Sequence, residues 1–312
     1  GSGEAFFDES NADADFVKVK PIIGDIDVTV PDCFKRMVWL YLRDIHGKQV
    51  TSNMTYVGNN RPNYHENSAQ INALFNYRGM NIQVDFEFLP YDADLNRPTE
   101  FSKFSHSSAW CDMQRGLKGV HHKYILRALA GGSSLRTDVQ VITRKTSKPQ
   151  ANPSGVTFNK FSVDRGLRIG SSVPVIEDGA HKMVNGLPAY HEVPTSQSAY
   201  ITDVCTIAQH MLGHELSCDE VEGSMYSFIG IMDLMKKYCS TDQIDATIKR
   251  MSVLYWGPGG QGFERDDPVG DEAVKMAGWC ALMEAFPEHV LDVTDLKDKY
   301  YQNYRSTSHT DD

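Results

Sequence analysis

The sequence predicts an α+β fold, with a strand-rich N-terminal part followed by a C-terminal helical bundle, and with extended terminal arms. Two observations predict it. Apolar and polar residues alternate in several short segments of the first half, which is typical of half-buried strands. In the last third, apolar residues recur every three or four positions behind helix-capping motifs, which is typical of amphipathic helices.

These patterns divide the chain into five expected parts. They are an N-terminal arm with the first strands (1–30), a strand-rich domain with a basic segment at 101–175 (31–175), a connector (176–196), an acidic helical bundle (197–305) and a flexible tail (306–312).

In the first half, most expected elements are strands. Residues Ile71, Leu74, Phe75 and Tyr77 have helical spacing and indicate a helix closed by Gly79. The expected strands are 16–20, 26–30, 36–43, 49–57 and 81–89, with residues 45–48 as a hairpin loop between the third and the fourth.

The middle of the chain shows weaker signals. Residues 120–130 fit a short helix stopped by Gly131, and residues 139–144 and 156–163 fit strands. Residues 166–195 are rich in glycine and proline and have little periodicity, so we expect a long connector that crosses a surface.

The helical part carries the clearest start signals. Ser217-Cys218-Asp219-Glu220 and Ser240-Thr241-Asp242-Gln243 are capping boxes, which predict helix starts. Asp267-Pro268 places an N-cap before a proline at the first helical position, and Thr294 can cap a last helix. The methionines of this part, Met225, Met232, Met235 and Met251, lie on the apolar stripes and are expected in the core.

Composition excludes several classes of protein. Hydrophobic residues make up 41% of the 312 residues and charged residues 23%, which is ordinary globular usage and excludes a disordered or collagen-like chain. No apolar run approaches the roughly 20 residues that span a bilayer, so no membrane is expected as a partner. The six cysteines are far apart and indicate reduced thiols in a reducing compartment.

Charge is segregated along the chain. Residues 101–175 carry 12 Lys and Arg against 3 Asp, whereas the segments before and after them have net charges of −6 and −13. A polyanion could bind such a basic segment through release of its counterions, and bases could stack on interleaved aromatic rings. The alternative is a charge match between the basic segment and the acidic part of the same or a neighbouring subunit.

The candidate nucleic-acid-binding residues are therefore the cations and aromatic residues of this segment. They are Arg115, Lys118, Lys123, Arg127, Arg136, Arg144, Lys145, Lys148, Lys160, Arg165, Arg168, Trp110, Tyr124, Phe158 and Phe161.

Two other groups contain residue types that occur in metal sites or in nucleophilic active sites. Cys205, His210, His214 and Cys218 have zinc-ligand chemistry, but helix-breaking signals separate them, so no metal or other cofactor is expected. Asp32-Cys33-Phe34 resembles, over three residues, the nucleophile segment of papain-like cysteine proteases. That resemblance implies a nucleophilic Cys33 at a helix start, activated by a histidine such as His46, His65, His106, His121 or His122. The alternation that follows Cys33 favours a strand instead.

Without a catalytic motif, the sequence favours a protein that is not an enzyme. The leading hypothesis is a self-assembling structural protein of the virus coat or nucleoprotein type, located in a virion or in host cytoplasm. Its basic segment would contact the phosphates of a nucleic acid, with RNA favoured over DNA, and its arms would contact neighbouring subunits. The alternatives are a cysteine hydrolase that uses Cys33 and a scaffold that binds only proteins.

Overall fold

The computed structural model describes fourteen stretches of the chain, and all structural statements below refer to them. They are residues 25–46, 50–52, 70–77, 80–92, 94, 97–106, 112, 114–131, 140–143, 157–163, 165–193, 200–258, 260–263 and 267–307. The fold is mixed α+β, with strands mostly in the N-terminal half and helices at the C-terminal end, as predicted. It divides into two compact units, residues 1–111 and 112–312. This division groups residues 112–175 with the C-terminal helices.

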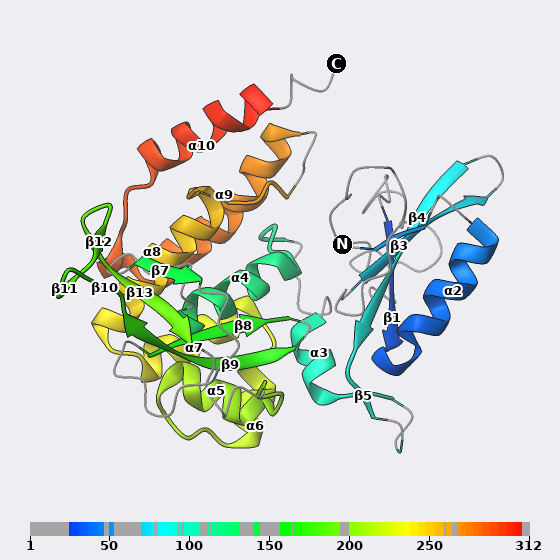
Figure 1. Cartoon of the computed structure of the whole chain (residues 1–312), viewed down its shortest axis with the longest axis horizontal. Coiled ribbons are helices and arrows are strands. Elements are labelled where there is room, and N and C mark those ends of the chain that lie inside the picture. The colour runs from blue at the N-terminus through cyan, green and yellow to red at the C-terminus, as the bar shows by residue number, and fades with distance from the viewer. Residues whose placement is uncertain are drawn as a thin grey trace. The chain divides into compact units, whose positions relative to one another are not determined.

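The first unit contains a four-stranded sheet in the order β1-β4-β3-β2 (Figure 1). β1 is parallel to β4, and the other neighbours are antiparallel. The elements are β1 (Asp25–Pro31), α2 (Lys35–His46), β2 (Val50–Ser52), β3 (Gln70–Tyr77), β4 (Met80–Leu89), β5 (Tyr91–Asp92), β6 (Arg97–Pro98) and α3 (Glu100–His106), with a 3-10 turn at Asp32–Phe34.

One face of this sheet forms a small core with α2. Trp39 and Leu42 of α2 are buried together with Ile71, Ala73 and Phe88 of the strands. The other face is polar. There the buried Asp85 carboxylate accepts hydrogen bonds of 2.6 Å from the side-chain amides of Gln70 and Asn72. The predicted alternation of residues 81–89 is therefore confirmed.

Two predicted elements of this unit are wrong. The expected strand 36–43 is the middle of helix α2, which also includes Ile45 and His46 of the expected hairpin loop. The expected helix around Ile71 and Tyr77 is strand β3, in which alternate residues Ile71 and Ala73 face the core. Short apolar runs fit both periods, and strand pairing of β3 with β4 decided between them.

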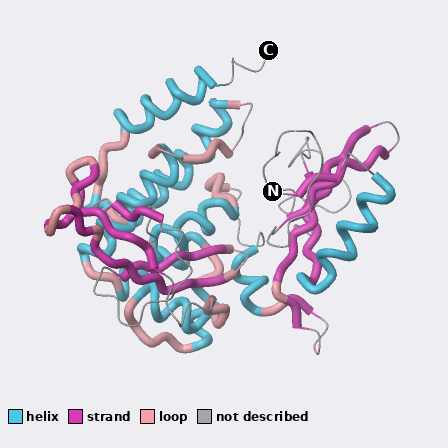
Figure 2. The backbone as a smooth tube through the Cα atoms, viewed as in Figure 1, coloured by secondary structure: helices cyan, strands magenta, loops and turns pink. Residues whose placement is uncertain are grey.

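The second unit contains a sheet in the order β12-β13-β9-β8, with β7 also paired to β13 (Figure 1). Figure 2 shows the strands in magenta. Helix α4 packs against β8. The strands are β7 (Gln140–Thr143), β8 (Thr157–Ser162), β9 (Gly166–Pro174), β10 (Ile176–Glu177), β11 (Ala180–His181), β12 (Met183–Val184) and β13 (Leu187–Val193). The helices are α4 (Gly119–Ala130), α5 (Val204–Leu212), α6 (Cys218–Ser224), α7 (Phe228–Tyr238), α8 (Thr241–Trp256), α9 (Pro268–Ala285) and α10 (Thr294–Thr307).

The expected connector at 176–196 instead contains strands: β10 and β11 form a separate two-stranded sheet, and β12 and β13 belong to the sheet above. Two tight hairpin turns reverse the chain, one at Asp178-Gly179 and one at Asn185-Gly186. All four residues have positive φ, between 51° and 79°. Positive φ at both central residues is the signature of type I′ turns, which Asp-Gly and Asn-Gly pairs favour. These two dipeptides were the sequence signal for the hairpins.

The predicted helix starts of the C-terminal part are confirmed, except that Thr294 is the first residue of α10 and donates its hydroxyl to Asp292 instead of capping the helix. Ser217 and Ser240 cap α6 and α8, and at α8 both halves of the capping box are present. Asp267 caps α9, with Pro268 as its first residue. The apolar stripes of these helices form the core. The four methionines of the predicted stripes are at most 1% exposed.

Candidate nucleic-acid interface

Helix α4 carries part of the predicted basic segment and is buried over most of its surface. Lys123 and Arg127 are four residues apart, so they lie on the same side of the helix, and both are half-buried. The Arg127 guanidinium lies 5.9 Å from the centre of the Tyr124 ring. α4 thus has two adjacent cations at its accessible edge.

Strands β8 and β9 bring two further cations together. Lys160 lies directly opposite Arg168 in the antiparallel register. Directly opposite residues project from the same face of a sheet, with Cβ atoms about 5 Å apart. Phe161 and Leu167, the next pair, are buried and project from the other face by alternation. Lys160 is exposed and Arg168 is half-buried, so solvent reaches this pair.

This cation pair has two energetic costs. Like charges directly opposite each other destabilise a sheet. In addition, the Nε atom of Arg168 is shielded from solvent and has no hydrogen-bond acceptor among the described residues. A buried N–H without an acceptor costs about 1–3 kcal/mol. A ligand with negative charge would relieve the repulsion between the two cations.

The acidic helices do not neutralise these cations. Within the described ranges, Lys123, Arg127, Lys160 and Arg168 form no ion pair. The carboxylates of the helices instead pair with lysines of the helical part itself: Glu220 with Lys237 (2.6 Å), Glu272 with Lys297 (2.9 Å) and Asp233 with Lys236 (3.4 Å). For these four cations, a charge match with the described residues of the same subunit is therefore not observed.

The remaining predicted cations of the described part differ in surroundings. Arg115 forms an exposed ion pair of 3.5 Å with Asp112, three residues earlier. Lys118 is half-buried just before α4. The Arg165 guanidinium lies 6.0 Å from the centre of the Tyr200 ring, near the turn between β8 and β9. Arg165 is exposed, so it adds a third cation to the β8–β9 end.

The predicted base-stacking role of two aromatic residues is wrong. Tyr124 is 5% exposed and stacks on Tyr255, with ring centres 5.7 Å apart, and Phe161 is also 5% exposed. Both rings are core residues, because α4 and the inner face of β8 are covered by the helices of this unit. Neither ring is accessible to a base.

Several predicted residues lie outside the described part of the chain. The side chain of Phe158 is one of them, although its backbone belongs to β8. The others are Trp110, Arg136, Arg144, Lys145 and Lys148.

Sequence reasoning missed a polar pocket of about 310 Å³ beside this interface. Its lining includes Arg250 of α8, His210 of α5 and Asn159, the neighbour of Lys160 in β8. The Arg250 guanidinium donates a 3.0 Å hydrogen bond to the Ala128 carbonyl at the end of α4. Arg250 lies far from the basic segment in the sequence, so only tertiary structure could associate them.

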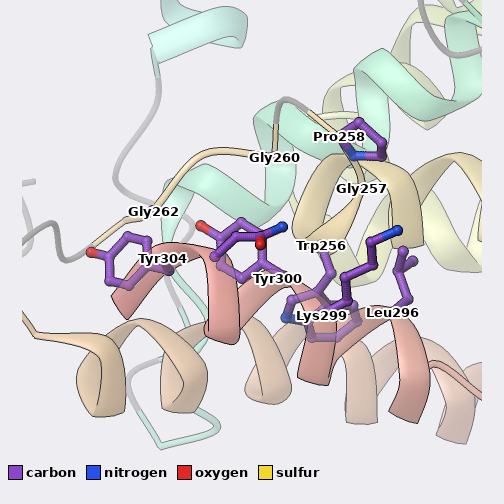
Figure 3. A pocket seen from close by; sticks show the side chains of 10 residues that line it. Trp256, Gly257, Pro258, Gly260, Gly262, Leu296, Lys299, Tyr300 and Tyr304 are labelled. Carbon is purple, nitrogen blue, oxygen red and sulfur yellow. The ribbon is translucent and has the colours of Figure 1, made fainter. Parts of the chain in front are cut away.

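An open aromatic groove of about 580 Å³ lies between the loop after α8 and helix α10 (Figure 3). Tyr300 and Tyr304 of α10 stack on each other, with ring centres 5.8 Å apart. A Cβ atom at Gly262 would lie only 2.7 Å from the Tyr304 ring, so a larger residue at this loop position would displace that ring. Exposed Lys299 lies at the same groove.

The metal-ligand candidates do not form a metal site. The Sγ atoms of Cys205 and Cys218 are 3.3 Å apart, but His214 packs against Tyr238 and His210 lines the polar pocket. Among the described residues, no three or more potential His, Cys, Asp or Glu ligands converge.

Cys33 lies where a helix begins, and not before the strand that the alternation favoured. It is exposed in the 3-10 turn that leads into α2, so the expected strand after it is a helix. Of the candidate bases, His121 and His122 belong to the second unit and are buried. The other three, His46, His65 and His106, have side chains outside the described part of the chain.

His121 and His122 are structural residues. The His121 Nδ1 atom is 2.7 Å from the Tyr255 hydroxyl oxygen, and His122 Nε2 donates a 2.8 Å hydrogen bond to the Met225 carbonyl. Burial lowers the pKa of each imidazole to about 4. Both are therefore neutral at pH 7.

Searches against protein-family models, curated proteins and solved structures found no match to this chain. Of the helices that the structure describes, none has the length and apolar character needed to cross a membrane. The arrangement of the side chains is therefore the basis for assigning a function.

Proposed function

We propose that this protein is a self-assembling structural protein that coats or packages nucleic acid, of the virus coat or nucleoprotein type. The observation that carries the proposal is the cross-strand pair of Lys160 and Arg168, two facing cations that solvent reaches and that form no ion pair with a described residue. Phosphate oxygens supply the negative charge that this pair lacks.

The chemistry favours a polyanion over a small anion. Lys160 and Arg168 on the sheet and Lys123 and Arg127 on α4 form two separate pairs of cations, none in an ion pair with a described residue. A chain of phosphates can contact several such pairs along its length and releases a counterion for each phosphate neutralised. Because the Tyr124 and Phe161 rings are buried, the accessible groups of these elements are suited to phosphates, and binding should depend little on base sequence.

The outer face of α2 supports the assembly half of this function. Phe34, just before the helix, and Met37, Leu40 and Tyr41 within it recur at helical spacing and are 39% to 66% exposed. An exposed apolar stripe of this kind is typical of a protein interface.

We assign this face to the N-terminal arm of a neighbouring subunit. The arm sequence combines Phe6 and Phe7 with five acidic residues between positions 4 and 15. Exposed Arg36 lies on α2 beside the apolar stripe, whereas exposed Arg43 pairs with Asp44 at 3.2 Å, so Arg36 supplies the charge match with the arm and the stripe supplies the apolar match.

The test is RNA binding as a function of salt, measured by fluorescence anisotropy with an unstructured single-stranded RNA. Three double variants are compared: Lys123→Glu with Arg127→Glu, Lys160→Glu with Arg168→Glu, and the control Lys249→Glu with Lys299→Glu. All three change the net charge equally. We expect the first two to lower affinity roughly tenfold and to flatten the salt slope by about 0.7 for each phosphate that no longer binds a cation. The control should retain both the affinity and the salt slope of the unmodified protein.

The single variant Lys160→Glu separates binding from folding. The new carboxylate would face Arg168 as an opposite charge, which stabilises a cross-strand pair by about 0.2–1 kcal/mol. We therefore expect higher thermal stability together with weaker RNA binding. Equal losses in all three double variants would indicate a nonspecific charge effect. Absence of RNA binding by the unmodified protein at low salt would favour the protein-only scaffold.

A further inference from the structure

The thiols of Cys205 and Cys218 are held next to each other by two helix ends. Cys205 is the second residue of α5 and Cys218 is the first residue of α6, and their Sγ atoms are 3.3 Å apart. Asp203 caps the start of α5, and Gly213 ends that helix with φ 73° so that the chain turns back. The proximity is thus built into the helix–turn–helix backbone.

The helix that carries Cys218 is also tied to the rest of the unit. The Glu220 carboxylate of α6 accepts hydrogen bonds from Lys237 Nζ (2.6 Å) and from the Tyr238 hydroxyl (2.8 Å), both on α7. Cys218 is exposed and Cys205 is partly exposed, so a small reagent can reach the pair. No metal site competes for these sulfurs within the described residues, since no third ligand converges on them.

We propose that Cys205 and Cys218 are a redox-active dithiol that a small-molecule disulfide converts into an intramolecular disulfide. This dithiol does not depend on the nucleic-acid function. It is a modification site that stabilises the α5–α6 corner under oxidising conditions and releases it under reducing ones.

The reaction proceeds by two thiol–disulfide exchanges. The exposed Cys218 loses its proton to solvent, and its thiolate attacks one sulfur of the small disulfide, which forms a mixed disulfide and expels one thiolate. Cys205 then loses its proton and attacks the Cys218 Sγ, which forms the Cys205–Cys218 bond and expels the second thiolate. The protein loses two hydrogens and the small disulfide is reduced to two thiols.

The surroundings bear on the second exchange and on the choice of reagent. Burial, followed by the neighbouring Cys218 and the carboxylates of Asp203 and Glu222, raises the pKa of Cys205 to about 11. Little thiolate therefore exists at Cys205 near neutral pH. Because the nearby charges are negative, a cationic disulfide such as cystamine should approach more readily than an anionic one.

The test uses the reduced full chain, incubated with cystamine and then blocked with iodoacetamide under denaturing conditions. We expect mass spectrometry to show four blocked cysteines instead of six. Trypsin cannot locate the bond, because no Lys or Arg lies between Lys182 and Lys236. Cleavage after glutamate separates the two cysteines, and we expect residues 193–215 linked to residues 216–220.

Thermal unfolding gives a second readout. A disulfide across the loop between Cys205 and Cys218 restricts the unfolded chain. The oxidised protein should therefore melt roughly 6–12 °C higher than the reduced one. Cys280→Ser, which removes another exposed thiol, should retain the cross-link and the shift. Cys218→Ser should lose both the cross-link and the shift in melting temperature. A stable mixed disulfide on the unmodified protein, or the same loss of two hydrogens in Cys218→Ser, would overturn the proposal.

Discussion

Among single residues, a buried ion pair in the second unit stands out for stability. Lys275 and Asp271 lie four residues apart on α9, with their side chains fully buried and Nζ 3.0 Å from Oδ2. The Asp271 carboxylate also accepts hydrogen bonds from the Tyr301 hydroxyl (2.9 Å) and from the Phe263 backbone N–H. The Lys275 ammonium lies 3.8 Å from the centre of the Tyr300 ring. These contacts connect α9 both to α10 and to the loop beside the aromatic groove.

We expect Lys275→Met to lower the free energy of unfolding by about 3–5 kcal/mol. The variant would leave the Asp271 carboxylate as an uncompensated buried charge. Urea unfolding measures the effect, and Lys299→Met, on an exposed part of α10, is the matched control with an expected change within about 0.5 kcal/mol. A change below about 1 kcal/mol in Lys275→Met would show that the pair contributes little.

Among the elements, α2 differs from every other helix of the described chain in its outer face. Trp39 and Leu42 bury one side of it against the sheet, while Met37 and Tyr41 on the other side are 61% and 66% exposed. The large exposed hydrophobics elsewhere, such as Ile176 and Val290, are isolated along the chain. The outer face of α2 is therefore the candidate element for subunit contact.

We expect Met37→Glu with Tyr41→Glu to reduce assembly without loss of stability, because both side chains already face solvent in the single subunit. Size-exclusion chromatography with light scattering, with absorbance at 260 and 280 nm recorded at low and high salt, measures particle mass and nucleic-acid content. Ile176→Glu with Val290→Glu introduces the same charges at isolated exposed positions and should leave particle mass unchanged. Unchanged mass in the α2 variant would exclude this face from the assembly contact.

For the molecule as a whole, the buried histidines couple stability to pH. The unfolded chain holds His121 and His122 at a pKa near 6.5, and the fold lowers both to about 4 through burial. Below pH 6.5 the unfolded state therefore takes up protons that the folded state does not. Stability from these groups is present above pH 6.5 and is lost as the pH falls.

Between pH 7 and pH 5 we expect the free energy of unfolding to fall by about 2 kcal/mol for each of the two histidines. Urea unfolding at pH 7, 6 and 5 measures this dependence. His122→Gln keeps an N–H that can reach the Met225 carbonyl and should remove about half of the pH dependence. A stability that is constant over this range would contradict the burial of neutral imidazoles.

Local chemistry was sufficient to predict the fold class, the helix starts of the C-terminal part and the alternating strand β4. Ser217, Ser240 and Asp267 satisfy backbone N–H groups of their own helices, whatever the rest of the chain does. The Asp-Gly and Asn-Gly turns were equally local and could have been recognised. The segregation of charge along the sequence was also visible. The basic segment 101–175 includes the four cations of α4, β8 and β9 that form no ion pair among the described residues.

Features that depend on distant partners required the folded chain. The apolar run of α2 fits either period, and the sheet beneath it made it a helix. Tyr124 and Phe161 became core because the helices of the second unit cover them. The facing cations of β8 and β9, and the contact between the thiols of α5 and α6, depend on strand register and on a chain reversal. Periodicity describes one segment at a time, whereas contact between segments depends on packing that the whole chain determines.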